Sequence, residues 1–174
     1  MLIQLLTMFR LFVEFNTVSL NLSKESFLFF PVFLAFFFLY IFILGPCPDS
    51  WISGVHGSCY KFSSNTLRWK SAKSVCEALG SKLAVLNSQD EQQFLTPKVA
   101  KNTWIGLHRD PKNTARWLWV DGSYATYTNW NDGEPNDVGG REDCVALLKP
   151  PYTGKWNDQN CNASVHYVCE ISRK

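Results

Sequence analysis

Seven oxygen-bearing side chains lie close together in the C-terminal third of the chain, within the stretch 134–158. Five of them are carboxylates and two are asparagine amides. Ca²⁺ takes about six to eight oxygen ligands from such groups in a flexible shell. If two loops bring these residues together, they predict a calcium site. The residues are Glu134, Asn136, Asp137, Glu142, Asp143, Asn157 and Asp158.

A cluster of Asp, Asn and Glu in a loop is most often a solvated turn surface. Here the spacing favours a metal site instead, because Glu134-Pro135-Asn136 is followed at a distance by Trp156-Asn157-Asp158. Two separate segments can then supply ligands to one ion.

The composition excludes several other classes of function. The net charge is only +2, which gives no indication of nucleic-acid binding. The sequence has no glycine-rich phosphate-binding loop, no HExxH zinc motif and no Ser/His/Asp order in a recognisable motif context. We therefore predict a binding protein rather than an enzyme.

Six cysteines stand at positions 47, 59, 76, 144, 161 and 169. An even number without a CxxC pair favours disulfides over zinc or redox chemistry. Six reduced, buried thiols in a cytosolic protein are the alternative. The sequence alone leaves the pairing open.

The first 45 residues differ in character from the rest. The stretch 27–44 is rich in phenylalanine and has no charge, and it is long enough for a membrane-spanning helix. Three interpretations stay open: a single-pass anchor with the N-terminus inside, a cleaved signal peptide, or translated intron sequence. All three leave 46–174 as the folded domain, and disulfides would place it outside the cytosol.

The pattern along this domain predicts a mixed fold with sparse regular structure. Apolar residues recur at helical spacing over 67–79, and Ser88 with Glu91 forms a capping box for a second helix that reaches about Leu95. The segment 121–143 predicts a long loop, which in a compact domain is usually functional or disordered. The predicted extended segments are a hairpin over 47–62 and strands over 83–85, 104–107, 116–120, 144–147 and 167–170.

Four marks over residues 47–172 together resemble the long form of the C-type lectin-like domain. They are Trp-Ile-Gly-Leu at 104–107, the six cysteines, Glu-Pro-Asn at 134–136 and Trp-Asn-Asp at 156–158. The resemblance implies an α+β fold with two helices, two small antiparallel sheets, a long calcium-binding loop region and three disulfides. The implied disulfides are Cys47–Cys59, Cys76–Cys169 and Cys144–Cys161.

The resemblance also implies a calcium site that binds sugar directly, with a cis-proline at Pro135. Glu before this proline and Asn after it resemble the order in family members that bind mannose, fucose or N-acetylglucosamine. A second, auxiliary calcium site is implied less completely, by Asp110, Asp137 and Asp143. The sugar-binding ligands carried over are Glu134, Asn136, Glu142, Asn157 and Asp158.

The expected partners are mannose-type glycans on glycoproteins or cell surfaces. A lectin-like domain that binds a protein ligand independently of sugar is the alternative. The domain is expected to be extracellular, either secreted or held at the plasma membrane. Homo-oligomers would add avidity, although the sequence shows no stalk that would assemble them.

Overall fold

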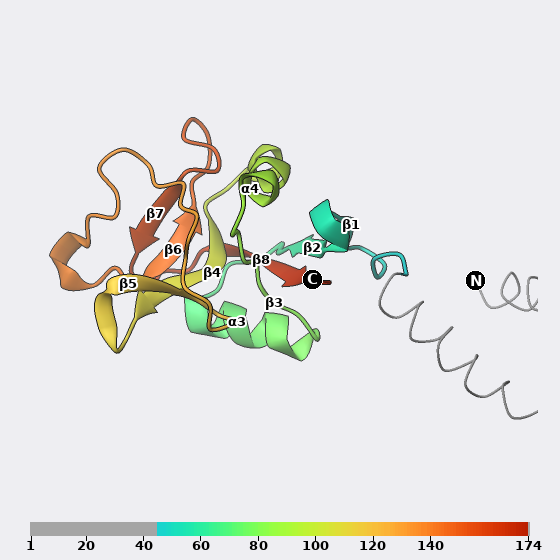
Figure 1. Ribbon diagram of the computed structural model, residues 1–174, viewed down its shortest axis with the longest axis horizontal. Helices are drawn as coiled ribbons and strands as arrows, with labels where there is room; N and C mark the ends of the chain where they lie inside the picture. Colours follow the sequence, from blue (N-terminus) through green and yellow to red (C-terminus); the bar gives the residue numbers. More distant parts are fainter. Residues whose placement is uncertain (1–44, 174) are drawn as a thin grey trace, which may run out of the picture. The chain divides into compact units, whose positions relative to one another are not determined.

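The computed structural model describes residues 45–173 of the chain (Figure 1). These residues contain two α-helices and eight short strands, and the last five strands follow the second helix. Short 3₁₀ turns lie at Val55–Gly57, Thr96–Lys98 and Val138–Gly140. The helices are α3 (Trp69–Ala78) and α4 (Gln89–Leu95). The strands are β1 (Ile52–Ser53), β2 (Cys59–Phe62), β3 (Lys82–Leu83), β4 (Thr103–Asp110), β5 (Asn113–Trp119), β6 (Cys144–Leu147), β7 (Trp156–Gln159) and β8 (His166–Ile171).

The strands form one mixed sheet rather than the two separate antiparallel sheets expected from the sequence. Strands β1, β2, β3 and β8 make one antiparallel part, and β4, β5, β6 and β7 make the other. A short parallel ladder between β4 and β8 joins the parts, with Thr103 opposite His166 and Trp104 opposite Tyr167. The α+β class, the two helices and the three disulfides are confirmed.

Helix α3 is two residues shorter at its start than the apolar spacing predicts. Leu67 is apolar, but its backbone bridges to Val165 and so holds an extended conformation. The helix ends at Ala78, one residue before the predicted end, and Gly80 beyond it has a φ of +66°. There the backbone N–H groups of Gly80 and Ser81 donate to the carbonyls of Glu77 and Cys76, the pattern of a Schellman ending.

Helix α4 begins at the predicted cap. The Ser88 hydroxyl accepts a hydrogen bond from the Glu91 backbone N–H, at 3.3 Å. The Glu91 carboxylate reaches back one residue further than in a capping box and accepts from the Asn87 backbone N–H, at 2.9 Å. The cap positions α4 with one buried face, which carries Glu91, Gln92 and Leu95.

All three disulfides have the pairing that the resemblance implied. Cys76–Cys169 ties α3 to β8, and Cys47–Cys59 closes the N-terminal hairpin. Cys144–Cys161 joins β6 to the segment that follows β7. The last of these braces the two strands on which the long loop rests.

Tryptophans form the floor beneath the long loop. Trp119 and Trp156 are fully buried and meet edge to face, with ring centroids 5.8 Å apart. Trp130, from the loop itself, packs on Trp156 at 5.6 Å and on Trp117 at 4.9 Å. These rings support the loop above the sheet.

Gln92 connects α4 to the strand that carries Asn157 and Asp158. Its side-chain oxygen accepts from the Trp156 indole at 2.7 Å, and its amide donates to the Gly154 carbonyl at 2.8 Å. Since Gln92 is only 4% exposed, water cannot readily replace these bonds.

We expect Gln92→Ala to destabilise the domain by about 2 kcal/mol, because the buried Trp156 indole N–H loses its partner and the Gly154 carbonyl keeps only the Asn129 amide. Gln93→Ala is the matched control on the exposed face of α4, and it should change stability by less than about 0.5 kcal/mol. Urea unfolding followed by tryptophan fluorescence measures both. Equal effects of the two substitutions would contradict the assigned role of Gln92.

The predicted membrane segment over 27–44 lies outside the residues that the structure describes. The predicted boundary between residues 1–45 and the domain 46–174 is therefore not tested. Within residues 45–173, no helix has both the length and the apolar character needed to cross a membrane.

Candidate functional site

The long loop after β5 comes back to lie beside β7, so the two acidic segments predicted from the sequence do meet (Figure 1). Backbone hydrogen bonds fix this approach. The Trp156 N–H donates to the Asn129 carbonyl, and the Asn131 N–H donates to the Trp156 carbonyl, each at 2.9 Å. Glu134-Pro135-Asn136 is thereby held next to Asn157-Asp158.

Asp158 lies at the centre of the site. Its side chain is fully buried, and its two oxygens accept hydrogen bonds from the backbone N–H groups of Asn136 and Asp137, each at 3.0 Å. A buried carboxylate needs such partners, because burial otherwise disfavours its charge. Asp158 therefore connects the long loop to strand β7 through hydrogen bonds.

Glu134 supplies a carboxylate that is only partly satisfied. Its peptide bond to Pro135 is cis, as the resemblance implied. One of its carboxylate oxygens, Oε2, is buried and has no hydrogen-bond partner. Burial raises the pKa of Glu134 from 4.5 to about 7, together with a hydrogen bond shared with the Asp158 carboxyl and the negative charges of Asp158 and Glu142. A cation beside this oxygen would relieve both effects.

Glu142 and Asn157 complete the group of five. The Glu142 backbone N–H donates to Asp137 at 3.0 Å, and its side chain accepts from the Val138 N–H at 2.9 Å. The Asn157 amide nitrogen donates to the Asp158 carbonyl at 2.6 Å, which leaves the amide oxygen available as a ligand. Both side chains are half-buried at the loop surface.

This donor set suits calcium in its chemistry, with three carboxylates and two amides. In residues 45–173, however, no three His, Cys, Asp or Glu side chains are gathered closely enough to hold an ion as they stand. The carboxylates of Glu134 and Glu142 would therefore have to turn inward on a bound cation. The buried, unpartnered Oε2 of Glu134 is the observation that favours such a cation.

The three residues predicted for an auxiliary site are not brought together around one point. Asp110 is buried, and its carboxylate accepts from the Lys112 backbone N–H at 2.9 Å and from the Tyr124 hydroxyl at 3.0 Å. These hydrogen bonds keep the pKa of Asp110 below its usual value. Asp137 and Asp143 instead form ion pairs with Arg109.

Arg109 is the site residue that the sequence did not predict. It follows the apolar run 104–107 on β4, directly before Asp110. One signal was available, because five carboxylates at 134–158 need compensating charge and a basic residue at the end of a neighbouring buried strand could supply it. The sequence did not show which of the two positions, 109 or 110, faces the loop.

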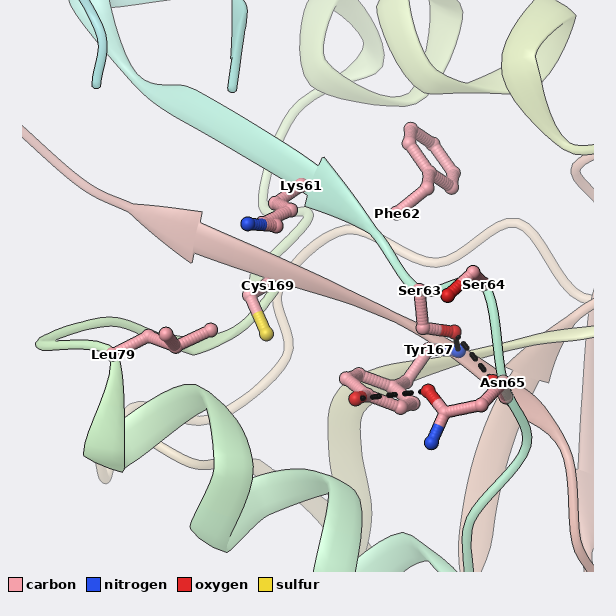
Figure 2. Close-up of a pocket in the computed structure, with 8 residues that line it drawn as sticks. All are labelled: Lys61, Phe62, Ser63, Ser64, Asn65, Leu79, Tyr167 and Cys169. Atoms are coloured by element: carbon pink, nitrogen blue, oxygen red, sulfur yellow. Dashed lines mark hydrogen bonds between the residues drawn. The ribbon is translucent and has the colours of Figure 1, made fainter. Parts of the chain in front are cut away.

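A hollow lies away from these loops, between the end of β2, the end of α3 and β8 (Figure 2). Its polar groups bond to one another. The Tyr167 hydroxyl donates to Asn65, and the Ser63 hydroxyl donates to the Asn65 carbonyl and accepts from the Tyr167 N–H. The hollow therefore presents few unpartnered groups to a ligand.

Comparison with known families and proteins identifies the fold. Residues 65–171 match the family model for the lectin C-type domain. Human C-type lectin domain family 4 member G is 40% identical over 129 residues, which cover 72% of this chain and 43% of that protein. The mouse low affinity immunoglobulin epsilon Fc receptor is 38% identical over 126 residues, which cover 71% of this chain and 37% of that receptor.

A solved structure shows the same fold. The cow carbohydrate-recognition domain of CD23, determined in the presence of a GlcNAc2Man3 oligosaccharide, superposes with a TM-score of 0.65 at 37% identity. The match covers 72% of this chain and 95% of that domain.

The chain spans less than half the length of either relative in the sequence comparison. What it shares with them is the carbohydrate-recognition domain, which is not an enzyme. The family model, the relatives and the fold together show that this chain belongs to the C-type lectin family.

Proposed function

We propose that this domain binds glycans through a single Ca²⁺ held by Glu134, Asn136, Glu142, Asn157 and Asp158. The observation that carries the proposal is the buried Oε2 of Glu134, which has no hydrogen-bond partner and lies beside a second buried carboxylate. Leaving such an oxygen unpaired is costly. A divalent cation satisfies it and neutralises most of the local negative charge.

When bound, calcium supplies a coordination shell large enough to accept two neighbouring sugar hydroxyls in place of water. The residues of the site then fix the orientation of each hydroxyl. A carboxylate accepts a hydrogen bond from the sugar hydroxyl, and an asparagine amide N–H donates a hydrogen bond to the hydroxyl oxygen. Glu134 and Asn136 would serve one hydroxyl, and Glu142 and Asn157 would serve the other.

The order of acceptor and donor across Pro135 supports a mannose-type preference. Glu134 precedes the proline and Asn136 follows it. In the family, this order resembles members that take equatorial 3- and 4-hydroxyls, as in mannose, fucose and N-acetylglucosamine. We therefore propose these sugars, presented on glycoproteins or cell surfaces, as the ligands.

A glycan array probed with the protein in calcium and again in EDTA tests the proposal. We expect binding to mannose-type glycans in calcium and loss of all binding in EDTA. Glycan binding that EDTA leaves unchanged would contradict the calcium mechanism. A protein partner retained in EDTA, with no glycan bound in calcium, would favour the alternative that the domain recognises protein.

Calcium affinity is expected to fall with pH below about 7. In the cation-free site, Glu134 is protonated below its raised pKa of about 7, and calcium must displace that proton. Affinity should therefore drop by up to about tenfold per pH unit as the pH falls from 7. The same linkage makes the cation-free fold lose stability as pH rises from 4.5 to about 7, so stabilisation by calcium should grow across this window.

Calorimetry in two buffers of different ionisation enthalpy measures the protons released on calcium binding. We expect net release near pH 7. An affinity that is the same at about pH 7.5 and pH 5.5, with no proton release, would contradict the linkage.

The domain is proposed to act outside the cytosol, where its three disulfides persist. Residues 1–45 would then be a membrane anchor over 27–44, a signal peptide or translated intron sequence, and residues 46–174 the lectin domain. One exposed site of this kind should bind a monosaccharide at about millimolar Kd. Clustering of copies in a membrane or a homo-oligomer would raise the avidity.

A further inference from the structure

Arg109 places a fixed positive charge among the acidic residues of the loop. Its Nε donates to Asp143 Oδ1 at 2.9 Å, and its Nη2 donates to Asp158 Oδ2 at 3.3 Å. The same Nη2 lies 3.8 Å from Asp137 Oδ2. Three carboxylates from two segments of the chain thus surround one guanidinium, whose side chain is only 15% exposed.

The remaining contacts of Arg109 leave it little freedom to move away. Nη1 donates to the Thr114 carbonyl and Nη2 to the Glu142 carbonyl, each at 3.1 Å. The guanidinium carbon lies 4.5 Å from the centre of the Trp117 ring, so an aromatic face covers it as well. The planar guanidinium can donate to all these oxygens at once while it stacks on Trp117. The ammonium group of a lysine could not make the same set of hydrogen bonds.

The oxygens around Arg109 are of the kind that would coordinate a second calcium ion. Two of them belong to Asp137 and Asp143, and backbone carbonyls complete the group. Calcium would need these oxygens at about 2.3–2.6 Å, but the charged guanidinium of Arg109 already contacts each of them. The third predicted ligand, Asp110, is held by Lys112 and Tyr124. An incoming cation would also meet the positive charge of the guanidinium.

We infer that Arg109 permanently replaces the auxiliary calcium, so that the domain binds one Ca²⁺ per chain. Arg109 is also a positioning residue for the proposed sugar site. It contacts the same oxygen of Asp158 that accepts from the Asp137 backbone N–H, and so orients a proposed calcium ligand without contacting sugar. This inference rests on the proposed function, because it concerns the ligands of the same ion.

The number of calcium ions bound by the wild-type protein tests the inference directly. The count is measured by equilibrium dialysis followed by metal analysis. A free calcium concentration of about 10 mM is used, because it exceeds the Kd range of weak extracellular sites. We expect one ion per chain. Two ions would overturn the role of Arg109 and leave the proposed function standing, whereas zero ions would overturn both.

Substitution of Arg109 gives a second, independent readout. Arg109→Asp replaces the guanidinium with a carboxylate beside Asp137, Asp143 and Asp158, and it should raise the count from one ion to two. Arg109→Lys keeps the charge but loses the fork. It should stay at one ion, bound about tenfold more weakly, because outer contacts that orient a ligand contribute on that scale.

Arg141→Asp makes the same change of charge at an exposed position in the same loop. It should keep one ion, with affinity within about threefold of wild type, because exposed charges are screened. If Arg109→Asp is folded by near-UV circular dichroism and still binds one ion, then Arg109 does not exclude the second. If it does not fold, the wild-type count decides.

Discussion

Asp158→Asn is expected to abolish calcium-dependent glycan binding. The substitution keeps the shape of the side chain but removes a charge that is fully buried and that faces Arg109 as well as two backbone N–H groups. Breaking a buried charge pair in this way typically costs several kcal/mol. That cost falls on the stability of the fold. Calcium affinity should fall by about 100-fold or more because the proposed site loses one of its three charged ligands. Isothermal titration with calcium, followed by binding to immobilised mannose, measures the loss.

Asp132→Asn is the matched control. Asp132 lies in the same loop, carries the same charge and is exposed. Its substitution should change calcium affinity by less than about threefold, because exposed charges interact weakly through water. Equal losses from the two substitutions would indicate that general loop charge, and not the buried carboxylate, holds the ion.

The double substitution Glu134→Gln with Asn136→Asp is expected to turn the preference from mannose towards galactose. It exchanges acceptor and donor across Pro135 while keeping the total charge of the site. The hydrogen bonds to one hydroxyl are then reversed, so a sugar with the original hydroxyl geometry leaves polar groups unpaired. With about tenfold for each of the two mismatched bonds, the mannose-to-galactose affinity ratio should change by about 100-fold.

Competition of free mannose and free galactose for an immobilised ligand measures this ratio. Calcium affinity measured in parallel shows that the ion is still bound. Glu134→Gln alone, which lowers the site charge by one carboxylate, separates loss of the ion from change of preference. A double variant that binds calcium normally and still prefers mannose would contradict the hydroxyl-orientation mechanism.

The sequence predicted both helices because residues at or near their ends carry local signals, such as helix caps. Ser88 marked a helix start that the structure confirms, and the apolar spacing over 67–79 predicted the first helix to within two residues at either end. The disulfide pairing, by contrast, came from resemblance to a family, since spacing alone left it open. Strand β7 was not predicted as a strand, because Trp156-Asn157-Asp158 is polar on one face and its pairing with β6 depends on distant residues.

The division of the acidic cluster into a sugar-binding set and an auxiliary pair, Asp137 and Asp143, stays a prediction. The arginine that contacts this auxiliary pair was not predicted. Whether Arg109 or Asp110 faces the loop is set by the register of β4 against β5, which shifts between these two residues. A one-residue shift in a strand reverses the direction of the side chain, and no motif in the sequence marked this shift. The result is an arginine beside Asp143 and an aspartate beside Tyr124.

A crystal structure of the protein with calcium and mannose tests the central claim most directly. Anomalous scattering from the metal would locate the ion without reference to the protein geometry. We expect one ion, ligated by Glu134, Asn136, Glu142, Asn157 and Asp158, with two neighbouring mannose hydroxyls in its shell. Mannose bound away from the ion, or an ion bound only at Asp137 and Asp143, would contradict the account.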